Sequence, residues 1–190
     1  MFKRKKKDLT DEEIVKSIVD QKNHDDFGLL YDRYSEKVYH KCISFVKDLD
    51  LAQDLAHDVF LKTFLNLSRF NHQSKFSTWL YSLTYNFCID YIRKNSKVRF
   101  EEDDELVNIP QNEDDINEKE LLQLRSERLA AVLELIPPGD KAILLMKYQD
   151  EMSISDIQAA MELAESAVKM RVARARAKAL EVYRKTYNDE

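Results

Sequence analysis

Apolar residues recur along this chain at spacings of three and four, and very little interrupts that pattern. The 190 residues include only two Gly and three Pro. These residue types are the strongest local helix breakers, so their scarcity permits long helices through most of the sequence. A spacing of three and four gathers apolar side chains on one face of a helix, whereas a half-buried strand needs a spacing of two. The sequence therefore predicts an all-α protein.

One acidic segment separates the two halves of the chain. Residues 101–120 carry ten acidic and one basic side chain, whereas the rest of the chain carries 25 acidic and 29 basic ones. Because this segment contains Pro110 and little apolar periodicity, we expect an extended linker that repels itself. Two readings stay open, a solubilising tether and a nucleic-acid mimic that occupies a basic channel on a partner. We expect these parts in order: a basic tail and N-terminal helix (1–24), a first helical domain (25–98), the acidic linker (99–120) and a second helical domain (121–190).

Several classes of protein are disfavoured by what the sequence lacks. Cys42 and Cys88 have no CxxC spacing, and the four His residues have no ligand spacing, so neither a disulfide framework nor a metal site is predicted. No apolar run reaches the length of a membrane span, and no signal peptide is recognisable. We therefore expect a cytoplasmic protein without membrane insertion. Without a catalytic constellation or Gly-rich loop we expect neither enzymatic activity nor a cofactor.

Aromatic residues are concentrated between residues 70 and 94. Seven of the 19 aromatic side chains lie there, among flanking basic residues: Phe70, Phe76, Trp79, Tyr81, Tyr85, Phe87 and Tyr91. Rings beside cations suit unstacked nucleotides, because bases stack on rings while cations hold phosphates. A helix buried on two sides accounts for most of the rings, including Trp79. One buried stripe is expected at Phe76, Leu80, Leu83, Phe87 and Tyr91.

A helix predicted at residues 49–67 has one acidic side. Asp50, Asp54, Asp58 and Lys62 are each four residues apart, opposite an apolar face. Like charges at this spacing repel one another weakly. A solvated face is the ordinary interpretation, but a row of like charges also suits docking on a basic partner surface.

The second half contains a helix-turn-helix pattern. Ser153 with Asp156 marks a helix start, a turn follows near Glu162, and the next helix buries small residues. Its expected outer face is basic: Lys169, Arg171, Arg174, Arg176 and Lys178. Two short, tightly joined helices with a basic second helix are typical of major-groove DNA binding.

Together the two halves resemble bacterial RNA polymerase sigma factors of the extracytoplasmic-function (ECF) group. Residues 27–94 are similar to region 2 of that family, and residues 133–185 are similar to region 4. The strings that carry the resemblance are FGLLYDRYSEKVY, DLAQDLAHDVFLKTF, FSTWLYSLTYNFCIDYIRK, ISDIQAAM and SAVKMRVARARAKAL. The resemblance implies a non-enzymatic subunit that binds core polymerase, recognises −35 and −10 promoter elements and aids DNA melting.

The resemblance also implies roles for individual residues. By this resemblance, the residues that bind core polymerase are Asp54, Leu55, Asp58, Phe60 and Lys62. The loop that receives a flipped base of the −10 element is Asn71, His72, Gln73 and Ser74. The residues that hold the DNA backbone around the melted stretch are Lys75, Asn86, Arg93 and Lys94. The face that enters the −35 major groove is Ser166, Lys169, Met170, Arg171 and Arg174.

Partners follow from the same resemblance: core RNA polymerase, promoter DNA and an anti-sigma factor. Two other classes stay open on the sequence alone. A helix-turn-helix regulator that acts without polymerase would leave the acidic helix side and the aromatic segment unexplained. A helical interaction protein, such as a decoy that binds core polymerase, would not need Arg171 and Arg174 for its activity.

Overall fold

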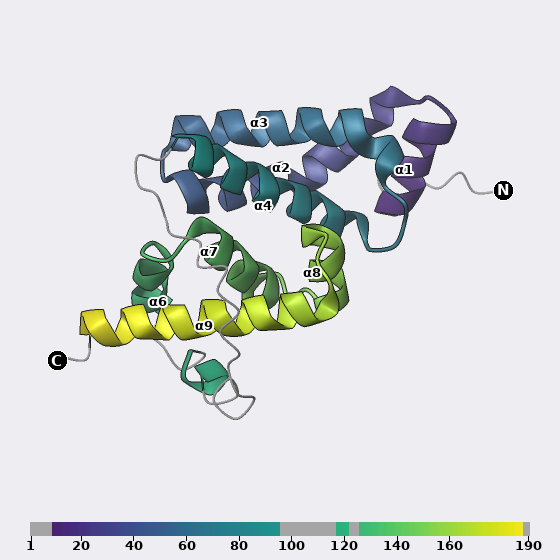
Figure 1. The fold of residues 1–190 in the computed structure, drawn as a ribbon. Helices are drawn as coiled ribbons and strands as arrows, with labels where there is room; N and C mark the ends of the chain where they lie inside the picture. The colour runs from purple at the N-terminus through teal and green to yellow at the C-terminus, as the bar shows by residue number, and fades with distance from the viewer. Residues whose placement is uncertain (1–8, 96–116, 122–125, 188–190) are drawn as a thin grey trace. The chain divides into compact units, whose positions relative to one another are not determined.

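The structure, a computed structural model, describes residues 9–95, 117–121 and 126–187 (Figure 1). Every regular element in these ranges is helical, which confirms the all-α prediction. The chain forms two compact units, residues 1–92 and 93–190. In the described ranges no helix is both long enough and apolar enough to cross a membrane. Most of the predicted linker and the first eight residues lie outside the described residues.

The described part of the N-terminal unit contains four α-helices and two short 3-10 turns, at His24–Asp26 and Leu67–Arg69. The helices are α1 (Asp11–Asp20), α2 (Phe27–Val46), α3 (Leu49–Asn66) and α4 (Phe76–Asn95). The spacing of Thr10 and Glu13 predicts a capping box, and Thr10 caps α1 in this reciprocal arrangement. Between α2 and α3 the chain turns at Lys47, whose φ of 56° is left-handed, and Asp48 then caps α3 by accepting from the Leu51 N–H at 2.9 Å.

Aromatic side chains fill the space between α2 and α4. The Phe45 ring meets Tyr85 edge to face at a centroid distance of 5.9 Å, and Tyr34 meets Phe76 at 5.7 Å. The Lys41 ammonium lies 4.2 Å from the centroid of the Tyr81 ring, which offsets part of the cost of burying that charge. Large rings thus form the contact between these two helices.

Burial along α4 corrects the predicted stripe. Phe76 and Leu80 are fully buried, but Leu83, Phe87 and Tyr91 are only half-buried. The buried line instead continues through side chains one or two positions further along: Thr84, Tyr85, Cys88 and Ile89. None of the seven aromatic side chains of residues 70–94 is exposed, so packing explains them, Trp79 included.

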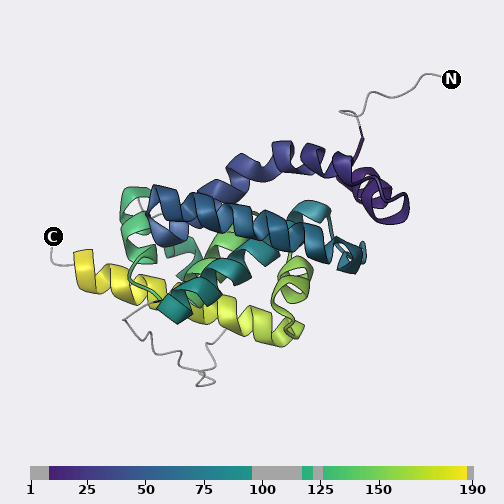
Figure 2. The same ribbon diagram turned by 90° about the horizontal axis from the view of Figure 1, so that it is seen from above.

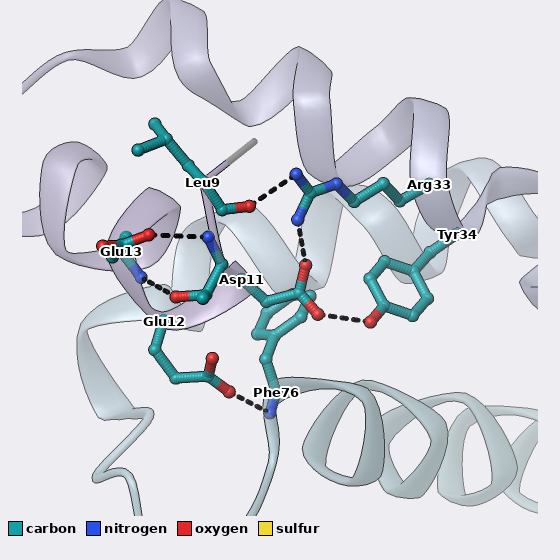
Figure 3. A network of polar contacts seen from close by, with 8 residues as sticks. Leu9, Asp11, Glu12, Glu13, Arg33, Tyr34 and Phe76 are labelled. Carbon is teal, nitrogen blue, oxygen red and sulfur yellow. Dashed lines mark hydrogen bonds and ion pairs between the residues drawn. The ribbon is translucent and has the colours of Figure 1, made fainter. Parts of the chain in front are cut away.

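Helix α1 is tied to both α2 and α4 by polar contacts (Figure 3). The Asp11 carboxylate pairs with Arg33 Nη1 at 2.6 Å and accepts a hydrogen bond from the Tyr34 hydroxyl. Burial, together with the neighbouring Asp11 carboxylate, raises the pKa of Tyr34 well above its usual range. Next to it, Glu12 Oε1 accepts the backbone N–H of Phe76 at 3.3 Å. This contact joins α1 to the first residue of α4.

The C-terminal unit is built around one long helix, α9 (Glu165–Tyr187). Shorter helices pack on it, with a π-helical turn between two of them. They are α6 (Ser126–Leu133), α7 (Pro138–Leu144), the turn Leu145–Gln149 and α8 (Ile154–Met161). Both ribbon views show α9 running along this unit (Figures 1 and 2). The sequence spacing of four, three and four predicted an inner face for this helix, and its residues are buried: Val168, Val172, Ala175 and Ala179.

Two details of this unit differ from the sequence-based expectation. Asp140 follows Pro137-Pro138-Gly139, and the sequence predicts that it caps a new helix. That helix instead begins at Pro138, and the Asp140 carboxylate lies 3.3 Å from Lys178 Nζ. Residues 117–121, expected within the linker or at its end, are helical, and Asn117 and Leu121 are buried. The end of the acidic segment is therefore part of the folded unit.

The corrected burial of α4 predicts unequal effects for two leucines of the same helix. Leu80→Ala should lower the free energy of unfolding of the N-terminal unit by about 2–5 kcal/mol, because a fully buried side chain leaves a cavity. Leu83→Ala should cost clearly less, because Leu83 is only half-buried. Urea unfolding followed by the fluorescence of Trp79, the single Trp of the chain, measures both. Equal losses would contradict the assigned face.

Candidate nucleic-acid and protein-docking surfaces

Helices α8 and α9 form a helix-turn-helix. Ser153 and Asp156 make the predicted capping box at the start of α8. The turn is made by Glu162, which ends α8 at a left-handed φ of 54°, a position where Gly or Asn is more usual. On the inner side Ile157 and Ala160 of α8 are buried, and the alanines of α9 allow close approach between the helices.

The five predicted −35 residues all lie in the first half of α9. Ser166, Met170 and Arg174 follow one another at a spacing of four, so they lie along one side of the helix. Ser166 and Lys169 are exposed, whereas Met170, Arg171 and Arg174 are half-buried. Lys169 Nζ pairs with Glu165 Oε1 at 2.6 Å across one turn. The structure thus gathers these residues, and their contact with DNA stays a prediction.

Arg176 is not an outer-face residue, contrary to the sequence-based assignment. It is buried, and its Nη1 lies 2.9 Å from Glu118 Oε1 and donates to the Tyr148 hydroxyl at 2.7 Å. The Tyr148 hydroxyl in turn donates to Glu118 at 2.8 Å. Two turns later Arg184 holds Glu120 with two hydrogen bonds, of 3.2 and 2.5 Å. Segment 117–121 is therefore attached to α9 by two acidic side chains.

The charge of Glu118 is stabilised by this network. Burial alone would raise the pKa of Glu118, but the hydrogen bond from Tyr148 and the Arg176 guanidinium outweigh it, so the pKa lies below its ordinary value of 4.5. A carboxylate with a lowered pKa stabilises the fold above its unfolded pKa, and that contribution is lost as the pH falls through the lowered folded value. The network therefore weakens in acid.

The acidic side of α3 is exposed, but two of its predicted docking residues are not. Asp50, Asp54, Asp58 and Lys62 are all exposed. Leu55 and Phe60 are buried at 2% and 4% exposure, so they were wrongly assigned as surface contacts. Phe60 instead supports the helix from inside, with its ring 4.7 Å from that of Tyr31.

Two leucines complete this face, and the sequence reasoning missed them. Leu61 and Leu65 are 58% and 68% exposed on α3. They continue the side occupied by Asp54 and Asp58, because the spacing from Asp54 is seven and eleven residues. In the sequence, that spacing is the pattern that could have identified both leucines as part of this face. The Lys62 ammonium lies 4.4 Å from the Phe87 ring centroid, so α4 holds it beside the acidic row.

The polar loop before α4 is mostly exposed, as a base-binding loop requires. Asn71, His72, Gln73 and Lys75 are exposed, and Ser74 is half-buried. Asn71 Oδ1 accepts the N–H of Gln73 at 3.2 Å, which is a local Asx-type turn. His72 adopts a left-handed φ of 58°, and its ring lies 4.6 Å from that of Phe70.

The remaining predicted −10 residues lie along α4 rather than at the loop. Asn86, Arg93 and Lys94 are exposed, and their spacing of seven and eight places them on one side of the helix. At 1.5 Å per residue, Arg93 lies roughly 27 Å along the axis from Lys75. The loop and the basic end of α4 are thus two separate contact points joined by one helix.

A small pocket lies directly beside the loop. It has a volume of about 220 Å³. Helix α1 supplies one wall and the segment from the second 3-10 turn to the loop supplies the other: Val15, Lys16, Val19 and Asp20, then Leu67, Ser68, Phe70 and His72. Sequence reasoning did not connect α1 with the loop, because more than fifty positions separate them. No group of His, Cys, Asp or Glu side chains suited to a metal ion occurs in the described ranges.

Sequence comparisons match the two helical units to two known protein families. The family described as sigma-70 region 2 matches residues 30–98, and the family described as sigma-70, region 4 matches residues 126–178. The ECF RNA polymerase sigma factor SigM of Bacillus subtilis is 28% identical over 163 residues, which cover 85% of this chain and 97% of SigM. The ECF sigma factor SigW of the same organism is 27% identical, with 81% and 87% covered.

Solved structures show the same fold at lower identity. CnrH, in complex with the cytosolic domain of CnrY, is 23% identical, with a TM-score of 0.57 over 89% of this chain and 94% of CnrH. The sigma factor RpoE, in complex with the anti-sigma factor NepR from Bartonella quintana, is 20% identical, with a TM-score of 0.57 over 83% of this chain and 96% of RpoE.

The attachment of segment 117–121 predicts different effects for its two acidic residues. Glu118→Ala should lower the free energy of unfolding of the C-terminal unit by about 1–3 kcal/mol, because it leaves the buried Arg176 without this carboxylate. Glu120→Ala, the matched control, should cost less than about 1 kcal/mol, because its partner Arg184 is exposed. Far-ultraviolet circular dichroism during urea unfolding measures both, with Trp79 fluorescence reporting separately on the other unit.

The same variant should change the pH dependence of stability. The wild-type protein should lose stability on acidification below about pH 4.5, the ordinary value for Glu118. Glu118→Ala should remove part of that loss, whereas Glu120→Ala should retain it. Parallel pH curves for wild type and Glu118→Ala would contradict the assigned network.

Proposed function

This chain belongs to the sigma-70 family of RNA polymerase sigma factors, in the ECF group, and from that membership we propose how its surfaces direct transcription initiation. The observation that carries the proposal is the presence of both promoter-reading regions in one chain, each matching one folded helical unit. The protein binds core RNA polymerase and places one unit on each promoter element. Binding energy does this work, and no covalent chemistry is needed.

In this proposal the first half of α9 reads the −35 element. A helix of this kind enters the major groove, where each base pair presents a distinct donor and acceptor pattern. Arg171 and Arg174 are suited to guanine edges or phosphates, and Ser166 and Lys169 to phosphates. Lys169 must exchange its partner Glu165 for a phosphate when DNA binds. Met170 offers an apolar contact between the polar ones.

The N-terminal unit acts on the −10 element. The exposed amide and imidazole groups of Asn71, His72 and Gln73 are able to hydrogen-bond a base edge, and Ser74 borders them. Extrusion of a base costs a few kcal/mol, which contacts at this loop must offset. Lys75 at one end of α4, and Asn86, Arg93 and Lys94 along it, would hold the phosphates of the melted strand.

The exposed side of α3 is the proposed core-polymerase surface. Asp54 and Asp58 supply charge for a basic partner surface, while Leu61 and Leu65 supply the apolar contact that a stable interface needs. Lys62 borders this face. Leu55 and Phe60 act indirectly, because they hold α3 in position from the core.

Cellular context follows from the proposed partners. Because core polymerase and promoter DNA are cytoplasmic in bacteria, we place the protein in the cytoplasm. RpoE is known in complex with an anti-sigma factor, and we propose a comparable inhibitor for this chain. The acidic linker would lie in a basic channel of the polymerase, since the channel would neutralise its self-repulsion.

Run-off transcription tests the function directly. Purified bacterial core polymerase, with and without this protein, is supplied with fragments of the genome of origin. Discrete transcripts that depend on the protein are expected, and their start sites define both promoter elements. Active core with a control sigma factor but no transcripts with this protein would instead favour a stand-alone regulator or a decoy, which DNA binding without polymerase separates.

Charge reversal on α3 should abolish docking. Asp54→Lys with Asp58→Lys should weaken binding to core polymerase by about tenfold or more, because like charges then face each other, while weak DNA affinity remains. Asp32→Lys with Glu36→Lys is the matched control, since this exposed pair has the same spacing on α2. Co-purification with core measures both. Undiminished recovery of the α3 variant would remove the docking assignment.

A single substitution on α9 should alter promoter choice. Arg171→Ala should weaken recognition at one position of the −35 element by about 1–3 kcal/mol. Lys185→Ala, near the end of the same helix and paired with Glu181, should leave recognition unchanged. Transcription from a promoter library randomised in the −35 element reads out both variants. A uniform loss across all sequences would assign Arg171 to phosphate contact instead.

A further inference from the structure

The two cysteines of the chain meet in the core of the N-terminal unit. Cys42 belongs to α2 and Cys88 belongs to α4, and 46 positions separate them in the sequence. We propose that these two thiols form a reversible disulfide under oxidising conditions, and that this cross-link weakens binding to core polymerase. The cross-link itself stands on the geometry of the two thiols, whereas its effect on polymerase binding rests on the proposed function.

The two sulfur atoms are already in contact. The Cys88 thiol donates to the Cys42 sulfur at an Sγ–Sγ distance of 3.8 Å, and both thiols are free and fully buried. Because a disulfide bond is about 2.05 Å long, the sulfurs must approach by about 1.8 Å. Rotation of the two side chains together with a small shift of α4 toward α2 provides this movement. The pair is therefore placed for an intramolecular bond.

An oxidant reaches the buried pair through the ends of the two helices. Cys42 lies about one turn before the end of α2, and Cys88 lies about two turns before the end of α4. Helix ends open more readily than helix centres, because fewer contacts hold them. The start of α4 is held instead by Glu12 of α1, whose Oε1 accepts the N–H of Phe76 at 3.3 Å. Opening of the last turns thus exposes the thiols while the rest of the unit stays folded.

The co-reactant in this proposal is hydrogen peroxide. One thiol sulfur attacks a peroxide oxygen, the O–O bond breaks, and a sulfenic acid and one water molecule form. The second thiol then attacks the sulfenic sulfur, and its proton leaves with the hydroxyl group as a second water molecule while the S–S bond forms. The two thiols together lose two electrons and two protons, and the peroxide gains them. A dithiol reverses the reaction by thiol–disulfide exchange.

The cross-link affects the proposed docking face through the residue next to Cys88. The Phe87 ring centroid lies 4.4 Å from the ammonium of Lys62, which borders the acidic row of α3. When Cys88 moves toward Cys42, Phe87 moves with it, so the ammonium of Lys62 loses its support beside that row. Helix shifts of about 1–2 Å are a common means of switching an interface. The oxidised protein therefore presents an altered surface to core polymerase.

Peptide mapping and urea unfolding of the full chain test the cross-link. After treatment of the native protein with hydrogen peroxide, protease digestion should yield one linked peptide pair that contains Cys42 and Cys88. The urea midpoint of the N-terminal unit, followed by Trp79 fluorescence, should rise, because the bond constrains the unfolded chain. Dithiothreitol should reverse both effects, so that reduced wild type is the reference. Cys42→Ala and Cys88→Ala, each with a single thiol left, are the matched controls and should show neither effect.

Binding to core polymerase, measured after the peroxide has been removed, tests the consequence. Oxidised wild type should bind core at least about fivefold more weakly than reduced wild type, and dithiothreitol should restore binding. Cys88→Ala should bind equally before and after treatment.

Several results would overturn the proposal. They are the absence of any reaction, which would assign both thiols to packing alone, oxidation of single thiols without a linked pair, a bond between two copies of the chain, and a cross-linked protein that binds core as tightly as the reduced one. Reduced wild type that does not bind core would instead overturn the proposed function, and with it the effect on polymerase, while the linked peptides still report on the cross-link. The two failures are therefore distinguishable.

Discussion

The arrangement of the N-terminal unit depends on the attachment of α1 at the junction between loop and α4. Asp11 binds Arg33 and Tyr34 of α2, and the next residue, Glu12, accepts the first backbone N–H of α4. The first amides of a helix have no partner within it, so a carboxylate there satisfies one of them and is favoured by the helix dipole. One turn of α1 thus sets the distance between α2 and the start of α4, and with it the exit of the loop.

The rings of residues 70–94 serve packing, which is the use that the sequence favoured for most of them. Tyr34, Phe45, Tyr81 and Tyr85 stand between α2 and α4, and Phe70 with Trp79 closes the end near the loop. Because these rings are committed to packing, they do not form an open surface, whereas the His72 ring beside Phe70 is exposed. The unit therefore separates two parts, aromatic groups that hold the scaffold and a short polar loop that stays at the surface.

Sequence patterns predicted the helices and the helix-turn-helix well, because both depend on spacing within a few residues. They failed to separate buried from exposed side chains where the two kinds lie on adjacent faces of one helix. Leu55 and Phe60 of α3 were assigned to docking from the family resemblance, although the apolar spacing of the helix places them inward, and Arg176 was placed outside because it lies among the cations of α9. Burial of Arg176 depends on Glu118, 58 positions earlier, in a segment whose composition resembles a linker. The pocket likewise unites α1 with residues 47 to 57 positions away. Such non-local pairs leave no periodic trace in one sequence.

The charge distribution explains how a protein of net charge −5 acts on DNA. After Arg176 and Lys178 are assigned to internal ion pairs, the outward cations of the recognition half of α9 are Lys169, Arg171 and Arg174. Neutralising about three phosphates gives a salt dependence of slope about −2.7 on logarithmic axes, far weaker than that of repressors that bind alone. Electrostatic attraction by this helix is thus too small to hold DNA unaided, while acidic groups on α3 favour a basic protein partner. Affinity must come from the assembled polymerase, and the helical units contribute selectivity within it.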